Sequence, residues 1–174
     1  MGLLNQFPGE QKKRMNYEKE KQIFAKAVEQ DMDRLYLLVY DILKNPQDAE
    51  DALASAILKA WETRGNMKHP DRIRGYLART ALNEAKTMFN KRKKMIPMEE
   101  IPENIDMFAT DNTGVWESVD RLKTREKEVV RLYYYYGYSV SEVADMLQIA
   151  QGTVKSRLST ARKHLRKEWE DEKR

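Results

Sequence analysis

Apolar side chains recur at intervals of three and four residues along most of the chain, and this spacing constrains the fold more than any other feature. The clearest stripe continues over several helical turns: Ala49, Ala52, Leu53, Ala56, Ile57, Ala60 and Trp61. Residues 23–43 and 129–165 carry the same period, whereas no segment shows the alternation of a β-strand. The sequence therefore predicts an all-α fold.

Helix boundaries can be placed around this stripe. Asn45 is a favourable capping residue and Pro46 suits a first helical position. Three acidic residues follow, where the helix dipole favours carboxylates: Asp48, Glu50 and Asp51. A further helix is expected from about Ile73 to Asn90, ahead of the basic run 91–94.

We expect two small helical domains joined by a linker. Residues 1–16 are predicted to be a frayed N-terminal tail, 17–94 a first domain and 117–174 a second. The segment 95–116 contains two prolines, a glycine and several acidic residues, but no Lys or Arg. Such a composition interrupts helices and predicts a flexible acidic linker.

The composition excludes several kinds of site. Cysteine is absent, which rules out disulfides, thiolate catalysis and cysteine-bound metals. The two histidines, His69 and His164, are far apart in the sequence, so we expect no metal, no cofactor and no enzymatic activity. No apolar run reaches the about 18 residues of a membrane span, and residues 1–16 lack a secretory signal. A soluble, cytoplasmic protein is expected.

The segment from Tyr138 to Arg166 has the pattern of a helix-turn-helix. Ser139 can cap a short helix, residues 148–150 can form a turn, and Gln151 can begin a longer helix. Small Ala144 suits the place where the two helices cross. Four residues should form the buried face of the second helix: Val154, Leu158, Ala161 and Leu165.

The opposite face of this second helix is polar and basic. It carries serine, threonine and lysine side chains, and residues 151–167 include six Lys or Arg residues but no Asp or Glu. Short hydroxyls can approach base edges in a major groove while cations neutralise phosphates. A solvated basic helix on a bundle is the alternative interpretation. The net charge of +4 permits a polyanionic partner without requiring one.

These residues resemble a known family. Residues 122–166, with Ser-Val-Ser-Glu-Val-Ala at 139–144 and Gly-Thr-Val-Lys-Ser-Arg-Leu at 152–158, look like region 4 of bacterial sigma factors, most similar to the extracytoplasmic-function (ECF) group. Upstream, Asn-Pro-Gln-Asp-Ala-Glu-Asp at 45–51, leading to Leu-Lys-Ala-Trp at 58–61, resembles region 2. Two motifs in the correct order are far less common by chance than one.

The chain departs from the family pattern at several positions. Ala54 and Ser55 stand where Gln-Glu is common, and Tyr76 stands where Trp is common. The helix-turn-helix turn reads Gln148, Ile149 and Ala150 in place of Gly-Ile-Ser. Gln148 is expected to adopt a left-handed conformation, and Ala150 lacks a capping hydroxyl.

The resemblance implies a factor that binds core RNA polymerase and directs it to promoters. The second helix of the motif would read the −35 element as duplex DNA. Lys155, Ser156, Ser159 and Thr160 would read bases, and others would mainly hold phosphates. The full implied −35 set is Gln151, Gly152, Thr153, Lys155, Ser156, Arg157, Ser159, Thr160, Arg162 and Lys163.

Region 2 would hold the −10 element as a single strand, through Arg64, Asn66, Lys68, Arg72, Arg74, Tyr76, Arg79 and Asn83. The region 2 helix would dock the polymerase clamp helices through Asp48, Glu50, Asp51, Leu53 and Ile57. Region 4 would engage the polymerase flap, and an anti-sigma factor would mask the same surfaces. Purely structural roles stay open for two of these residues. Tyr76 is equally consistent with an aromatic side chain of the core, and Asn83 with a helix cap or with a hydrogen bond that links two helices.

Successive helical positions differ by 100°, so the four tyrosines at 133–136 cannot all be buried. Tyr134 and Tyr135 are expected either at a partner surface or in ordinary exposed packing. Two other functions compete with the sigma-factor interpretation. A stand-alone helix-turn-helix regulator leaves the region 2 pattern unexplained, and a metal-dependent nuclease would have to use Asp48 and Asp51.

Overall fold

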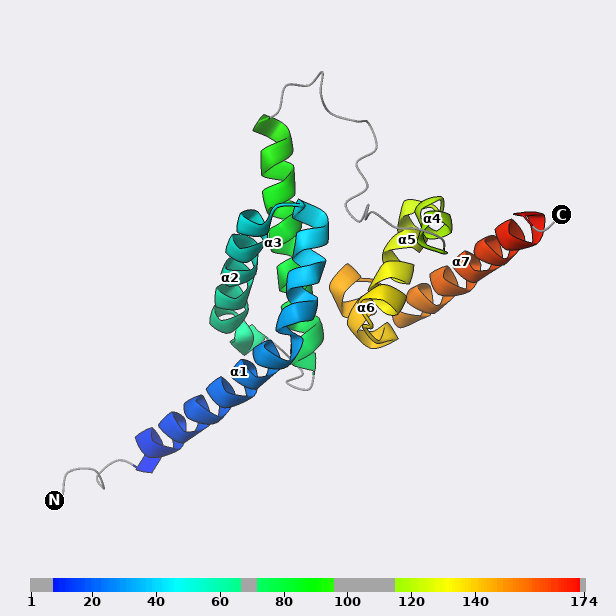
Figure 1. Cartoon of the computed structure of the whole chain (residues 1–174). Coiled ribbons are helices and arrows are strands. Elements are labelled where there is room, and N and C mark those ends of the chain that lie inside the picture. Colours follow the sequence, from blue (N-terminus) through cyan, green and yellow to red (C-terminus); the bar gives the residue numbers. More distant parts are fainter. Residues whose placement is uncertain (1–7, 67–71, 96–114, 173–174) are drawn as a thin grey trace.

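The computed structural model describes residues 8–66, 72–95 and 115–172, and every regular element among them is a helix (Figure 1). The all-α fold class is therefore confirmed. In chain order the elements are α1 (Pro8–Leu43), α2 (Pro46–Glu62), the 3₁₀ turn η1 (Arg64–Asn66), α3 (Ile73–Met95), α4 (Val115–Asp120), α5 (Thr124–Val130), the π-helical turn η4 (Arg131–Tyr135), α6 (Val140–Leu147) and α7 (Gln151–Glu172).

Helices α1, α2 and α3 pack against one another and form the N-terminal module. Four alanines on α2 are essentially inaccessible to solvent, which lets the neighbouring helices approach closely: Ala49, Ala52, Ala56 and Ala60. Asn45 caps α2, since its side-chain oxygen accepts a hydrogen bond from the Asp48 N–H at 3.0 Å, and Pro46 occupies the first helical position. Both features match the expected start of the helix.

Two helices are longer than the sequence indicated. Helix α1 begins at Pro8, so residues 8–16 are helical where a frayed tail was expected. The Lys, Glu, Gln and Arg side chains of this segment lose little rotamer freedom in a helix. Helix α3 continues through the basic run to Met95, because cations in a last turn interact favourably with the helix dipole. Most of the expected linker, residues 96–114, lies outside the described residues, and Val115 and Trp116 belong to α4.

The C-terminal module is built from α4 to α7. Helix α7 packs against α4, α5 and α6, and buries the predicted Val154, Leu158 and Ala161. The tyrosine run passes through η4 and then leaves helical geometry. Tyr136 is 3% exposed, while Tyr134 and Tyr135 are 51% and 40% exposed, so the expectation that the four rings cannot share one core is confirmed.

The two modules contact each other directly through α3 and α6, which lie side by side in Figure 1. The buried apolar side chains of both modules form one continuous cluster. Tyr136 and Tyr138, in the segment that leads into α6, belong to this cluster and are buried. The two modules therefore share one interior in this structure.

Candidate nucleic-acid interface

Helix α6 begins with a complete capping box. The Glu142 N–H donates to the Ser139 hydroxyl oxygen at 3.2 Å, and the Ser139 N–H donates to the Glu142 carboxylate at 2.8 Å. Two of the free N–H groups at the helix start are thereby satisfied. The predicted capping role of Ser139 is confirmed.

The turn between α6 and α7 has the conformation that the sequence predicted. Gln148 lies in the left-handed region at φ 55°, ψ 44°, where a non-glycine residue is strained. The Ala150 carbonyl accepts from the N–H groups of Thr153 and Val154, and so begins α7 without a side-chain cap. The Gln151 amide donates to the Ser141 hydroxyl at 3.2 Å and ties the two helices together.

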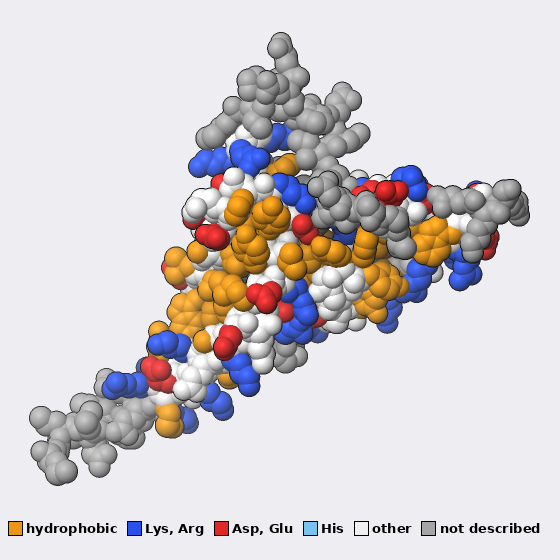
Figure 2. All heavy atoms as spheres, viewed as in Figure 1, with side chains coloured by type: hydrophobic (Ala, Val, Ile, Leu, Met, Phe, Trp, Pro, Cys, Tyr) orange, Lys and Arg blue, Asp and Glu red, His pale blue; other side chains and the backbone are white. Residues whose placement is uncertain are grey.

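The outer face of α7 presents most of the residues expected to contact duplex DNA. Eight are exposed, namely Gln151, Gly152, Lys155, Ser156, Ser159, Thr160, Arg162 and Lys163, while Thr153 and Arg157 are half-buried. The Ser156 and Thr160 hydroxyls donate to carbonyls of the preceding turn, each at 3.0 Å, which leaves their oxygens free to accept. Lys and Arg side chains line the outer edge of α7 in Figure 2.

Arg162 of the expected −35 set is exposed, and its side chain also contacts η4. Its Nε donates to the Tyr134 hydroxyl at 2.9 Å, and the guanidinium lies 6.0 Å from the Tyr134 ring centre. Both residues border an apolar pocket that is also lined by Trp116, Val119, Leu165 and Trp169.

Several residues expected to hold the −10 strand make structural contacts at the junction of α2 and α3. The Arg64 guanidinium stacks over the Trp61 ring at 3.6 Å and donates to the Trp61 carbonyl at 2.7 Å. The Tyr76 hydroxyl lies 2.6 Å from the Thr63 hydroxyl, and Tyr76 is half-buried against the hydrophobic core. Asn83 is exposed. Asn66 lies in η1, and Lys68 is outside the described residues.

Three other arginines of the −10 set face the C-terminal module. Arg72 pairs with Asp145 at 3.4 Å, and Arg74 pairs with Glu142 at 3.6 Å. The side-chain oxygen of Gln148 faces Arg79 in the amide orientation that satisfies its hydrogen bonds. This oxygen then accepts from Arg79 Nη2 at 3.0 Å and from Arg79 Nε at 3.2 Å. Each of these residues therefore contacts the turn-bearing motif of the other module in this structure.

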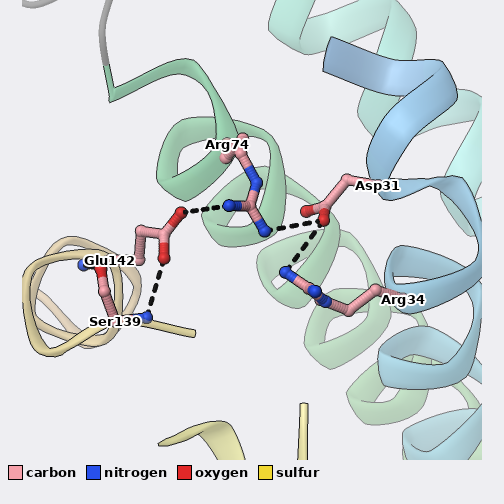
Figure 3. A network of polar contacts seen from close by, with 5 residues as sticks. All are labelled: Asp31, Arg34, Arg74, Ser139 and Glu142. Carbon is pink, nitrogen blue, oxygen red and sulfur yellow. Dashed lines mark hydrogen bonds and ion pairs between the residues drawn. The ribbon is translucent and has the colours of Figure 1, made fainter. Parts of the chain in front are cut away.

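Arg74 sits at the centre of a network that joins α1, α3 and α6 (Figure 3). The buried Asp31 carboxylate pairs with both Arg34 and Arg74 at 3.1 Å, while Arg74 also reaches Glu142. Burial lowers the pKa of Arg74, but the carboxylates of Asp31 and Glu142 outweigh this and raise its pKa overall. The guanidinium is therefore held in its charged form.

The predicted polymerase-binding residues lie on α2 beside α1. Asp48 pairs with Arg92 of α3 at 3.0 Å, while Glu50 and Asp51 are exposed. Leu53 is buried and Ile57 half-buried, and both line a shallow apolar groove with Met32, Tyr36, Leu37, Glu50 and Ala54. Met32 and Leu37 remain exposed in this groove, and Figure 2 shows hydrophobic side chains gathered on the visible face of the N-terminal helices.

Residues 8–66, 72–95 and 115–172 contain no group of three or more His, Cys, Asp or Glu side chains arranged to hold a metal ion. Within the same ranges, no helix is long and apolar enough to cross a membrane.

Two family models match the chain in the order that these modules follow. The model for sigma-70 region 2 matches residues 27–95, and the model for sigma-70 region 4 matches residues 119–167. Together the matches span more than half of the sequence. The chain belongs to the sigma-70 family, in the ECF group. Helices α1 to α3 are its region 2 module, and the helix-turn-helix of α6 and α7 lies in its region 4 module.

The relatives of this sigma-70 family member are named as RNA polymerase sigma factors, several of them as ECF sigma factors. The ECF RNA polymerase sigma factor SigM of Mycobacterium tuberculosis is 30% identical over 126 residues, which is 70% of this chain and 64% of SigM. This chain thus spans about two thirds of the length of that relative. The RNA polymerase sigma-E factor of Streptomyces coelicolor is 29% identical over 153 residues, covering 83% of this chain and 85% of the relative.

Solved structures show the same fold. The sigma factor RpoE, in complex with the anti-sigma factor NepR from Bartonella quintana, matches with a TM-score of 0.58 at 20% identity, over 83% of this chain and 94% of that one. CnrH, in complex with the cytosolic domain of CnrY, matches with a TM-score of 0.57 at 20% identity, over 85% and 88%.

The contacts between regions 2 and 4 of this ECF chain were missed by sequence reasoning. A signal for them is present in α1, where Asp41 falls among strongly apolar neighbours; Asp31 lies in a polar stretch and is paired within region 2. Both carboxylates are buried, and a buried carboxylate requires a partner. For Asp31 the partners are arginines, and for Asp41 they are Lys44 and Tyr136.

Proposed function

We propose that this chain is a transcription initiation factor that binds core RNA polymerase and directs it to specific promoters. The observation that carries the proposal is the exposed polar and basic face of α7, on a helix whose other face is anchored in a region 4 module. A region 2 module precedes it in the same chain. The polymerase would perform the chemistry, and the chain itself would catalyse nothing.

The two family matches also support a proposed domain division. Residues 17–94 would act as the region 2 domain and 117–174 as the region 4 domain, with 95–116 connecting them. The helical residues 8–16 would extend the first domain. This arrangement fits a factor whose domains touch separate parts of one promoter.

Region 4 would read the −35 element as duplex DNA with α7 in the major groove. Lys155, Ser156, Ser159 and Thr160 are exposed on one face and would contact base edges. Thr153, Arg157 and Lys163 flank that face and would hold phosphates, which fixes orientation. Arg162 would join them only after leaving Tyr134.

Region 2 would hold the −10 element as an unpaired strand. Asn83 and the positive residues around η1 and the start of α3 form the proposed surface, since cations beside aromatic rings suit unstacked bases. Arg64 and Tyr76 would contribute mainly by holding the η1 segment in shape, because both are engaged with α2.

Two surfaces would receive protein partners. The groove between α1 and α2, with the exposed Glu50 and Asp51 nearby, would take the clamp helices of the polymerase. The pocket lined by Trp116, Tyr134 and Trp169 would take an apolar element of the flap or of an anti-sigma factor. Because RpoE and CnrH are found with anti-sigma partners, an anti-sigma factor is part of the proposal. The cytoplasm, where the polymerase acts, would be its compartment.

Run-off transcription tests this proposal. Purified chain is added to core RNA polymerase on a library of promoter templates, and core alone is the control. We expect transcripts that begin at a restricted set of templates only when the chain is present. A gel shift with the chain alone separates the competing functions: tight sequence-specific binding without core, together with no effect on start-site choice, would instead support a stand-alone regulator.

A further inference from the structure

Helix α1 begins well before the family match. The model for sigma-70 region 2 starts at residue 27, whereas the helix starts at Pro8. In Figure 1 this first part of α1 extends away from the bundle that the helix forms with α2 and α3. Every side chain from residue 12 to residue 23 is exposed, so burial of apolar surface contributes little to this part of the helix. The contacts that it makes are with the end of α2 and with η1.

The Arg64 guanidinium lies against two aromatic rings, one of which belongs to this part of α1. Its central carbon is 3.6 Å from the ring centre of Trp61 and 5.5 Å from that of Tyr17. The two rings meet edge to face with their centres 5.7 Å apart, and Phe24 packs edge-on against Trp61 at 5.2 Å. A guanidinium is attracted to the face of an aromatic ring. Tyr17 of α1 and Trp61 of α2 therefore hold the same cation.

Polar contacts hold Arg64 in the same place. Its Nη1 donates to the Trp61 carbonyl at 2.7 Å, and its Nε pairs with the Glu20 carboxylate of α1 at 3.5 Å. Arg64 is the first residue of η1. The preceding residue, Thr63, is bound to α3, since its hydroxyl lies 2.6 Å from the Tyr76 hydroxyl. The start of η1 is thus held by α1, α2 and α3 together.

We propose that Tyr17 and Glu20 are positioning residues for the −10 strand, which act through Arg64 to fix the position of η1. The proposal rests on the proposed function, in which η1 and the start of α3 hold the unpaired strand. Neither residue would touch DNA itself. Groups that recognise a ligand must be held in a narrow range of positions by supporting contacts, so a looser η1 should weaken discrimination among −10 sequences. Reading of the −35 element by α7 should not change.

Substitutions of Tyr17 separate the ring contact from other effects. Tyr17→Ala removes the ring, and alanine favours the helix, so α1 should remain folded. Tyr17→Phe keeps the ring and should restore the behaviour of the wild-type chain. Met15→Ala is the matched control, because Met15 lies in the same part of α1 and is 71% exposed.

Run-off transcription with core polymerase, on a library varied at both promoter elements, measures the effect on selection. We expect Tyr17→Ala to reduce discrimination among −10 sequences by about two- to fivefold, the factor that corresponds to an exposed cation–π contact. The −35 preference should stay unchanged. An equal loss at every template, or unchanged −10 discrimination, would overturn the proposal. If the wild-type chain directs no transcription, the proposed function itself fails, which is a different result.

Hydrogen exchange measured by mass spectrometry tests the positioning role without polymerase or DNA. We expect the backbone amides of residues 64–66 to exchange faster in Tyr17→Ala than in the wild-type chain. In Tyr17→Phe and Met15→Ala they should exchange at the wild-type rate. Equal protection in Tyr17→Ala and the wild-type chain would show that α1 does not hold η1, whatever the result of transcription.

A charge reversal tests the contribution of Glu20. Glu20→Lys places a like charge beside Arg64, whereas Glu18→Lys makes the same change in net charge at an exposed position of the same helix. We expect faster exchange at residues 64–66 and weaker −10 discrimination only in Glu20→Lys. Added salt should reduce the difference, because Glu20 is 61% exposed and exposed charges are screened. Identical behaviour of the two variants would overturn the role of Glu20.

Discussion

Tyr136 donates a hydrogen bond to Asp41 across 95 positions of sequence, with 2.7 Å between the two oxygens, and both side chains are buried. Asp41 lies in α1 and Tyr136 in the segment that leads to α6. The bond therefore joins region 2 to region 4. A buried hydroxyl and a buried carboxylate each need a hydrogen-bond partner. Since each serves the other here, the bond stabilises the packing of the two modules.

Removing this hydroxyl should destabilise the chain. Tyr136→Phe keeps the ring but leaves the buried carboxylate with Lys44, which lies 3.4 Å away, as its remaining partner. We expect the free energy of unfolding to fall by about 1.5 kcal/mol, the lower end for a hydrogen bond to a charged group. Urea denaturation followed by circular dichroism measures this. Tyr135→Phe is the matched control, since Tyr135 is exposed, and an equal effect of the two substitutions would contradict the role of the bond.

Ionisation of the buried tyrosines provides a second test. Burial raises the pKa of Tyr136, and its hydrogen bond to Asp41 adds to this; burial and the nearby Asp31 raise the pKa of Tyr138. Both folded-state pKa values lie above the unfolded value near 10. The two neutral tyrosines therefore stabilise the folded chain fully below about pH 10. This stabilisation of the folded chain is lost as the pH rises further.

Tyrosinate absorbance at alkaline pH can distinguish the two buried tyrosines from the exposed ones. We expect the absorbance of the buried tyrosinates to appear only when the chain unfolds, at the same pH at which the circular dichroism of the helices is lost. The double variant Tyr136→Phe, Tyr138→Phe should lack this delayed fraction of the absorbance. If the wild-type chain shows no delayed fraction, the two hydroxyls are accessible and the buried interface is wrong.

The helices and the DNA-facing side of α7 could be predicted from sequence because they depend on local spacing. The period of Val154, Leu158 and Ala161 sets which side of α7 is buried, and Asn45 and Ser139 mark the starts of their helices. These are short-range effects of helical geometry and hydrogen-bond satisfaction. The strained conformation of Gln148 could also be predicted, because the turn requires it whichever residue occupies that position.

The contact between the modules could not be predicted in the same way. The ion pairs between the modules are Arg72–Asp145 and Arg74–Glu142. In the sequence, charged residues of this kind are as consistent with a solvated surface as with an ion pair between modules. Nothing in their local spacing indicates which acid meets which base. Arg162 illustrates a related limit, because nothing in its local spacing indicated the hydrogen bond that it donates to the Tyr134 hydroxyl.

The start of α7 offers a stabilising substitution. The Ala150 carbonyl accepts the first helical hydrogen bonds, but its methyl side chain can accept none. Ala150→Ser supplies a capping oxygen and should raise the free energy of unfolding by about 1 kcal/mol. Thermal denaturation measures the change. Ala54→Ser, an exposed position inside α2, is the control and should not stabilise the chain.

Substitutions on the two modules should alter preference at different promoter elements. Lys155→Ala and Ser156→Ala remove exposed groups of α7 and should relax selection at the −35 element, by about 1–3 kcal/mol for a base contact. Asn83→Ala should change selection at the −10 element only. Sequencing transcripts from a promoter library, with core polymerase, reads both positions in one experiment. A uniform loss across the library, or effects at the opposite elements, would contradict this division.

Neutralising the acids of region 4 should weaken the contact between the two modules without disturbing α7. Glu128→Gln, Glu142→Gln and Asp145→Asn together remove all three charges, and glutamine at 142 can still complete the capping box. Each partly exposed pair contributes about 0.2–1 kcal/mol, so the combined change is enough to shift a marginal equilibrium. We expect a larger radius of gyration at low salt and a smaller response to added salt than in the wild-type chain. Glu50→Gln and Asp51→Asn, exposed acids outside the interface, are the controls, and the same expansion in those variants would mean that net charge alone opens the chain.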